Sequence, residues 1–231
     1  MLRRRGITSL PTFLGMAIRS IVVETLRKGY HPVKLVTGHG EVECRHYVAP
    51  EARRAAVFVG GAGGGWDSPA GGLYPLLCQE LLESQIASLR VRYRYPAVLE
   101  ESVLDVLAGI AFLQSQGIER VAVIGWSFGG AVVIQAGARS AVVRTVVTFA
   151  TQSHGASVVS QLPIDCSILL LHGTGDGTLP PSCSEHTYRL AHEPKRLLLY
   201  EGADHAFSLV ADEVRQVVRE WLVEEVAPHE T

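Results

Sequence analysis

The sequence predicts an α/β protein whose mostly parallel sheet is covered by helices on both faces. The first observation is that strand-like and helix-like runs alternate from about residue 30 onward. The second is that most of the strand-like runs are continuously apolar, which is typical of strands buried on both faces. The third is composition, since 47% of the 231 residues are hydrophobic and 19% are charged. That balance favours one domain with a large core and argues against disorder.

The predicted elements follow one another with short connections. Residues 33–36 and 42–48 are expected to form an antiparallel hairpin around Gly38-His39-Gly40. Further strands are expected at 55–59, 89–93, 121–124, 143–149, 168–171 and 197–200. Helices are expected at 73–86, 99–113, 131–138, about 182–192 and 210–222. The segment 150–166 is too short to hold a large cap domain, so the sequence predicts a rather open site.

Residues 1–29 are expected to form an N-terminal helical extension to a domain of residues 30–231. Leu14, Ile18, Ile21 and Leu26 could share one apolar helix face. The run after Arg3-Arg4-Arg5 faintly resembles a signal peptide, but polar residues interrupt it and no clear cleavage site follows. It is also too short to span a membrane. A removed targeting segment and an extension upstream of Met16 remain as alternatives.

Charge and cysteine content exclude several classes of protein. The formal net charge is −2, and no large basic block occurs beyond the first residues, so no nucleic-acid partner is expected. The four cysteines stand at 44, 78, 166 and 183, and none has a CxxC or metal-ligand spacing. The sequence therefore predicts reduced thiols, no metal site and a cytoplasmic location. It carries no signal for the oligomeric state.

The strongest chemical signal is the run Gly125-Trp126-Ser127-Phe128-Gly129-Gly130. It directly follows a buried strand and directly precedes a helix, which is the context of the G-x-S-x-G nucleophile elbow. Such a turn raises a serine hydroxyl above the carboxyl ends of the strands, where ligands bind in these sheets. The helix N-terminus points at the same place, so the Phe128 amide is expected to face a developing oxyanion. A glycine-rich turn used only for packing is the alternative.

Ser127 needs a base, because a serine hydroxyl is a poor nucleophile at neutral pH. His205 is the best candidate among nine histidines, since Gly202-Ala203-Asp204-His205-Ala206-Phe207 lies between the last strand and the last helix. A histidine on that loop could lie over the serine. His172 is a weaker candidate for the base and more commonly shapes the turn after its strand, whereas His154 could line the pocket.

The acid that orients the base is expected in the loop after the strand 168–171. Asp176 lies there, in His172-Gly173-Thr174-Gly175-Asp176-Gly177-Thr178-Leu179-Pro180. It gives the chain order Ser, Asp, His that this turn type implies. Its rivals are Asp165, which precedes the strand, and Asp204, which lies beside the histidine. The acid would accept a hydrogen bond from the imidazole and stabilise the imidazolium.

A second oxyanion donor is expected in the glycine-rich loop Gly60-Gly61-Ala62-Gly63-Gly64-Gly65-Trp66. Small residues let a substrate oxygen approach backbone N–H groups, and Gly61 or Ala62 is the candidate. A glycine-rich loop after a strand could also bind phosphate. Against that, no Gly-Lys-Ser/Thr follows and no helix begins at once.

Taken together, the serine, acid and histidine motifs resemble the α/β-hydrolase superfamily over about residues 33–225. They are most similar to small, cap-poor dienelactone-hydrolase-like and carboxylesterase-like members. The resemblance implies an eight-stranded sheet with antiparallel first strands, a covalent acyl-enzyme and no cofactor. Dienelactone hydrolases proper use a cysteine nucleophile, so Ser127 points away from a dienelactone substrate.

Substrate-binding residues are less clearly marked. Trp66, Trp126 and His154 are candidates, and Trp66 and the segment 150–166, which holds His154, are expected to shape the pocket. Arg94 ends the run Leu89-Arg90-Val91-Arg92-Tyr93-Arg94, whose alternation is unusual for a buried strand. It could bind an anionic group of the substrate, or it could be an ion-paired structural residue.

The predicted function is hydrolysis of a carboxylic ester or thioester of a small molecule through a Ser127 acyl-enzyme. A peptidase or amidase could use the same three residues, and a perhydrolase or carbon–carbon hydrolase could use a modified oxyanion site. The non-enzymatic alternative is an inactive hydrolase fold that binds or scaffolds. The three intact motifs argue against that last reading, because a binding protein has no need of all of them.

Overall fold

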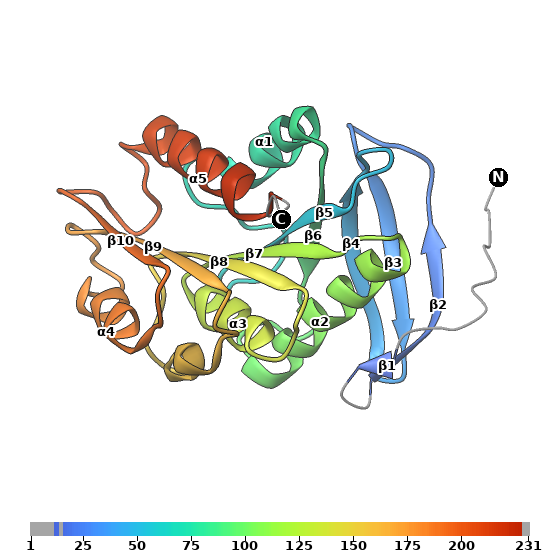
Figure 1. Ribbon diagram of the computed structural model, residues 1–231, viewed down its shortest axis with the longest axis horizontal. Coiled ribbons are helices and arrows are strands. Elements are labelled where there is room, and N and C mark those ends of the chain that lie inside the picture. Colours follow the sequence, from blue (N-terminus) through green and yellow to red (C-terminus); the bar gives the residue numbers. More distant parts are fainter. Residues whose placement is uncertain (1–11, 14–15, 228–231) are drawn as a thin grey trace.

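The computed structural model describes residues 12–13 and 16–227. One ten-stranded sheet runs through the molecule in the order β1-β2-β3-β4-β6-β5-β7-β8-β9-β10 (Figure 1). The strands are β1 (Thr12–Phe13), β2 (Met16–Val23), β3 (His31–Thr37), β4 (Gly40–Tyr47), β5 (Arg54–Val59), β6 (Ile86–Arg92), β7 (Arg120–Trp126), β8 (Val143–Phe149), β9 (Ser167–Gly173) and β10 (Lys195–Tyr200). The strands from β6 to β10 pair in parallel, and those from β1 to β4 pair antiparallel, as does β4 with β6.

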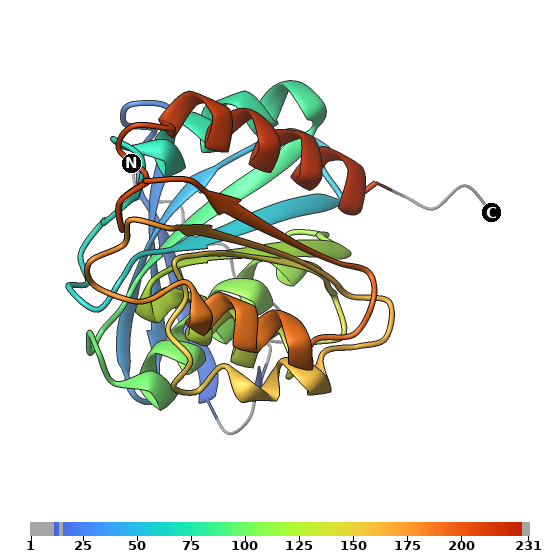
Figure 2. The same ribbon diagram turned by 90° about the vertical axis from the view of Figure 1, so that its left-hand side faces the viewer.

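Helices cover both faces of the sheet, as the sequence predicts (Figures 1 and 2). The helices are α1 (Leu73–Glu80), α2 (Leu99–Ser115), α3 (Phe128–Gly137), α4 (Ser182–Leu190) and α5 (Ala211–Glu225), with short 3-10 turns at Leu81–Ser84 and Ser157–Gln161. Helices α1 and α5 lie on one face, and α2, α3 and α4 lie on the other. Each face has its own apolar cluster, one beneath α2 and α3 and one beneath α1 and α5.

The central strands run parallel, so the loops at their carboxyl ends can together form a site. Residues 121–125 of β7 are fully buried, and β7 lies between β5 and β8 with both neighbours parallel to it. Parallel strands end at the same edge of the sheet, so the loops after β5, β7, β9 and β10 open on one side. Between β8 and β9 the chain holds only the turn Ser157–Gln161, and no cap domain interrupts residues 16–227.

The predicted N-terminal helix is wrong for the residues that the structure describes. Residues 16–23 form β2, which pairs antiparallel with β3 and buries Ile18. The apolar spacing fits a helix, but Ile18, Ile21, Val22 and Val23 are β-branched residues that favour strands, and the edge of β3 offers hydrogen bonds. Strands β1 and β2 also make the sheet ten-stranded where eight strands are expected. Leu14 lies outside the described residues.

The structure also tests the length of the first predicted helix and the state of the cysteines. The helix expected at 73–86 ends at Glu80, because a 3-10 turn follows and Gln85 has φ of 55° before β6 begins. All four cysteines are free, as predicted. Among the described residues, no helix is both long and apolar enough to cross a membrane.

Candidate active site

Ser127 occupies the sharp turn between β7 and α3. Its backbone has φ of 57° and ψ of −118°, a strained conformation for a residue with a side chain. A Cβ at position 125 would lie 2.1 Å from the carbonyl oxygen of Gly129, so only glycine lets the strand and the helix approach so closely. The turn predicted from Gly125 to Gly129 is therefore present with the geometry that such an elbow requires.

Two backbone segments flank Ser127. Helix α3 begins at Phe128, and the first amides of a helix have no partner within the helix. A Cβ on Gly61 would lie 3.7 Å from Cβ of Ser127, which places the loop after β5 against the serine. The hydroxyl of Tyr93, the residue after β6, donates to the carbonyl oxygen of Gly60 over 3.2 Å and ties that loop to the end of β6. Ala62 follows Gly61 on the exposed side.

Asp176 and His205 meet although 29 residues separate them. Nδ1 of His205 lies 2.7 Å from Oδ2 of Asp176. The Asp176 side chain is 0% exposed and that of His205 is 18% exposed. The loops that carry them are joined by backbone hydrogen bonds, since the amide of Gly175 donates to the carbonyl oxygen of Ala203 over 3.1 Å. Asp176 and His205 are thus held as a pair by the chain itself.

Trp126, the residue before Ser127, contacts the loop that carries His205. Its indole Nε1 donates to the carbonyl oxygen of His205 over 3.0 Å, and the centroids of the two rings lie 5.4 Å apart. The same indole faces Gly61, where an added Cβ would be 3.6 Å from it. Trp126 therefore connects the histidine loop, the loop after β5 and the end of β7, which directly precedes Ser127.

The charge state of Asp176 follows from its hydrogen bonds. Burial alone would raise the pKa of this carboxyl, but hydrogen bonds from the Leu179 amide and from His205 outweigh burial and hold the pKa below its ordinary value. Oδ1 also accepts from the Thr178 amide over 2.7 Å. An ionised Asp176 orients the Nδ1 proton of His205 toward itself and leaves Nε2 of His205 as the basic nitrogen.

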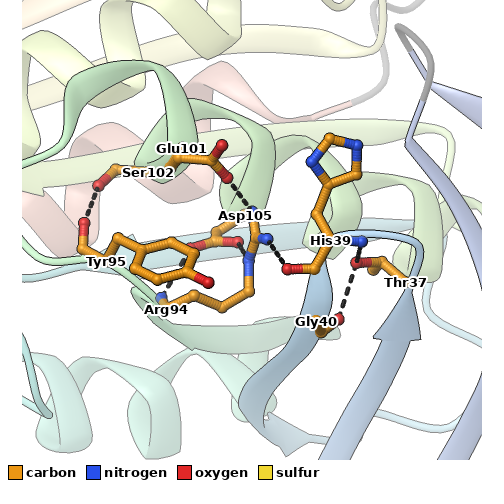
Figure 3. Close-up of polar contacts among 8 residues, drawn as sticks. All are labelled: Thr37, His39, Gly40, Arg94, Tyr95, Glu101, Ser102 and Asp105. Carbon is orange, nitrogen blue, oxygen red and sulfur yellow. Dashed lines mark hydrogen bonds and ion pairs between the residues drawn. The ribbon is translucent and has the colours of Figure 1, made fainter.

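Arg94 does not reach this site. Nη1 donates to the carbonyl oxygen of His39 over 2.6 Å, Nη2 lies 2.8 Å from a carboxylate oxygen of Glu101, and Nε pairs with Asp105 (Figure 3). The side chain is 5% exposed. The anion-binding role considered for Arg94 is therefore wrong, because every guanidinium nitrogen is already occupied by this chain. The ion-paired alternative describes it.

Two further candidates for substrate binding lie on loops of the same molecule. The Trp66 ring stacks on the Arg45 guanidinium at 4.0 Å, and its carbonyl oxygen accepts from Arg90. His154 is exposed, and its role stays a prediction, as does that of Trp66.

The two rival acids have other partners. Asp165 pairs with Arg144, and Asp204 accepts hydrogen bonds from Ser208.

His172 does not face the serine turn as a base would, and its contact with Asp176 was not predicted. His172 is fully buried, and its Nε2 lies 3.2 Å from Oδ2 of Asp176, the oxygen that also faces His205. Its position at the end of the strand before the acid loop was the only available signal.

Arg94 and its partners Asp105, His39 and Glu101 form a second polar group, called here the Arg94 cluster. A cavity of about 400 Å³ lies beside this cluster and is lined by Gly38, His39, Tyr95, Val98 and Glu101. No metal-binding cluster of three or more His, Cys, Asp or Glu occurs among residues that the structure describes.

Comparison with known proteins gives the family. The family model described as "Dienelactone hydrolase family" matches residues 82–221. No curated protein sequence matches. Among solved structures, a dienelactone hydrolase from Anabaena variabilis has a TM-score of 0.74 at 18% identity, over 86% of this chain and 98% of that one. Est1E from Butyrivibrio proteoclasticus has a TM-score of 0.69 at 15% identity, over 81% of this chain and 96% of that one.

A third similar structure, an esterase from Pyrococcus furiosus, has a TM-score of 0.68 at 16% identity, over 86% of this chain and 93% of that one. At these identities the structural likeness establishes the fold, and the family model, which covers most of the domain, establishes the family. The chain therefore belongs to the dienelactone hydrolase family and is a hydrolase with the α/β-hydrolase fold.

Proposed function

We propose that this hydrolase cleaves a carboxylic ester or thioester of a small molecule, with Ser127 as nucleophile, His205 as base and Asp176 as the acid that orients the base. The single observation that carries the proposal is the 2.7 Å contact between His205 and Asp176, on loops that the Trp126 indole ties to the strained elbow of Ser127. A structural ion pair would not require a neighbouring serine with φ of 57°.

The proposed reaction has two acyl-transfer steps. Nε2 of His205 takes the proton of Ser127 Oγ while Oγ forms a bond to the substrate carbonyl carbon. The carbonyl oxygen becomes an oxyanion that accepts hydrogen bonds from the amide of Phe128 and from that of Gly61 or Ala62. When the tetrahedral intermediate collapses, the bond to the alcohol or thiol breaks, and His205 gives the leaving group its proton.

Water completes the cycle. His205 takes a proton from water as the water oxygen attacks the acyl carbon, and the bond between that carbon and Ser127 Oγ then breaks. Oγ recovers the proton from His205, and the carboxylic acid leaves. Asp176 stays ionised throughout and stabilises the imidazolium that forms in each step. Neither step calls for a cofactor.

The test is hydrolysis of a panel of p-nitrophenyl esters, matched thioesters and matched anilides by wild type and Ser127→Ala. We expect ester or thioester turnover by wild type, and a loss of roughly 10⁵-fold in kcat for the variant. Circular dichroism should show that Ser127→Ala folds as wild type does. Turnover of anilides alone would replace the proposal by an amidase, and undiminished ester turnover by Ser127→Ala would refute the role of Ser127.

A further inference from the structure

His172 lies behind the acid of the proposed triad, at the end of β9. Its side chain is fully buried between helix α4 and the loop that carries Asp176. Nδ1 lies 2.7 Å from Oγ of Ser184 on α4. Nε2 lies 3.1 Å from the carbonyl oxygen of Leu179 and 3.2 Å from Oδ2 of Asp176. The ring therefore makes polar contacts at both of its nitrogens, and one nitrogen faces the acid loop.

These contacts fix the tautomer of His172. The carbonyl oxygen of Leu179 can only accept a hydrogen bond, so Nε2 carries the proton and Nδ1 accepts from the Ser184 hydroxyl. Burial lowers the pKa of His172 below its ordinary value, although Leu179 and Asp176 oppose that shift. At neutral pH the ring is therefore uncharged and presents an N–H to Leu179 and Asp176.

The Asp176 carboxylate is surrounded by donors on both of its oxygens. Oδ1 accepts from the amides of Thr178 and Leu179 over 2.7 and 2.9 Å. Oδ2 faces the imidazole of His205 at 2.7 Å and that of His172 at 3.2 Å. Leu179 is held twice, because its amide donates to Asp176 and its carbonyl oxygen accepts from His172. His172, Leu179 and Asp176 thus form a closed set of contacts.

We propose that His172 is a positioning residue for Asp176. Its Nε2–H fixes the Leu179 turn and stabilises Oδ2, so that the carboxylate keeps the rotation in which Oδ2 faces Nδ1 of His205. A neutral donor suits this task, because a second cation at 3.2 Å would compete with His205 for the same oxygen. The catalytic consequence rests on the proposed function, whereas the effect on the pair of Asp176 and His205 does not depend on it.

The test compares three substitutions of His172 with a matched control. Gln places its amide nitrogen as many bonds from Cβ as Nε2 of histidine, so His172→Gln keeps the donor. Asn reaches only the position of Nδ1, and Phe keeps the ring without any donor. The control is His46→Phe, since His46 is also a buried histidine, on β4, where its ring packs on the edge of Phe112.

The expected kinetic result is a loss in kcat with little change in KM. His172→Phe and His172→Asn should lower kcat by about 10- to 100-fold, as small misplacements of catalytic groups do. His172→Gln should stay within about 3-fold of wild type by the same argument. His46→Phe should leave kcat per folded molecule unchanged, which separates loss of a buried histidine from loss of the Nε2–H donor.

A second readout needs no catalysis. The proton between His205 and Asp176 should give a low-field ¹H NMR resonance, assigned by its absence in Asp176→Asn. We expect it in wild type, His172→Gln and His46→Phe, and expect it shifted upfield or lost in His172→Phe and His172→Asn. An unchanged resonance in a folded His172→Phe or His172→Asn protein would overturn the proposal, as would equal kcat losses in the folded Gln and Asn variants. If wild type hydrolyses nothing, the proposed function fails, while the resonance still tests His172.

Discussion

Two buried carboxylates, Asp176 and Asp105, lie near the same edge of the sheet. They differ in whether their basic partner keeps a nitrogen that is free to react. Both side chains are 0% exposed and both face a basic group. Asp105 pairs with Arg94, and each guanidinium nitrogen of Arg94 already has a partner within the chain (Figure 3). Asp176 faces His205, and among the described residues Nε2 of that histidine has no hydrogen-bond partner. A buried pair supports chemistry when one of its members keeps a reactive atom toward solvent.

The pKa values of the two carboxyls differ in the same way. Burial raises the pKa of Asp105 to about 6, although hydrogen bonds from Arg94 work against the shift. For Asp176 the hydrogen bonds outweigh burial and lower the pKa. Asp176 accepts from two backbone amides in addition to His205, and such fixed donors stabilise the anion. The comparison is consistent with the catalytic role proposed for Asp176 and with a structural role for Asp105.

The largest expected effect comes from exchanging each acid for its amide. Asp176→Asn should lower kcat by roughly 10⁴-fold, because the amide no longer supports the correct tautomer of His205. Asp105→Asn should keep kcat within a few-fold of wild type. Steady-state ester hydrolysis by the two folded variants measures this, and equal losses in both would remove the distinction between the two carboxylates.

Removing Arg94 should affect stability most strongly. Arg94→Met leaves Asp105 buried without its cation, which costs about 3–5 kcal/mol of unfolding free energy. Urea denaturation followed by fluorescence measures the loss. The kcat of the folded variant at low temperature should remain near the wild-type value. A stable Arg94→Met protein that loses activity would instead return Arg94 to the list of substrate-binding residues.

The stability of wild type should depend on pH through Asp105. Its folded pKa of about 6 exceeds the ordinary value of 3.8, so its stabilising contribution is present below about pH 4 and is lost as pH rises through about 6. Asp176 has the opposite sign, since its stabilising contribution is present above about pH 4 and is lost as pH falls through the lowered pKa.

Between pH 4 and 7, wild type should therefore lose up to about 3 kcal/mol of unfolding free energy relative to Asp105→Asn. Urea denaturation of the two proteins at four pH values across this range gives the difference. A difference that does not change with pH would mean that Asp105 is ionised throughout, and the contrast with Asp176 would then lie in geometry alone.

The smallest effect is expected at the partly exposed member of the Arg94 cluster. The Glu101 side chain is 31% exposed and lies 2.8 Å from Arg94. Because water screens such a pair, Glu101→Gln should cost no more than about 1 kcal/mol. Thermal unfolding compared with Arg94→Met checks the ranking, and a cost equal to that of Arg94→Met would show that Glu101, rather than Asp105, balances the cation.

The sheet core, the parallel order of its strands and the elbow at Ser127 could be predicted because each depends on local pattern. A continuous apolar strand followed by Gly-x-Ser-x-Gly has few alternative structures. The loop positions of Asp176 and His205 follow from the order of strands, since the carboxyl ends of parallel strands meet at one edge. The structure places the two side chains in contact, and their catalytic roles remain the proposal made above.

The strand at residues 16–23 and the partners of Arg94 could not be predicted because they depend on segments distant in sequence or on another element. The strand β2 exists because β3 offers it an edge, and its apolar spacing alone fits a helix equally well. The charge of Arg94 is balanced by Asp105, which lies among apolar residues on the buried face of α2. The contact of His172 with Asp176 depends on the path of the acid loop, which no spacing of residues reveals.

The activation of Ser127 is tested most directly by intact mass spectrometry after incubation with a fluorophosphonate. Wild type and Ser127→Ala are treated side by side, with Asp105→Asn as a folded control. We expect one adduct on wild type and on Asp105→Asn, and none on Ser127→Ala. An adduct of equal extent on Ser127→Ala, or no adduct on well-folded wild type, would contradict the activation of Ser127.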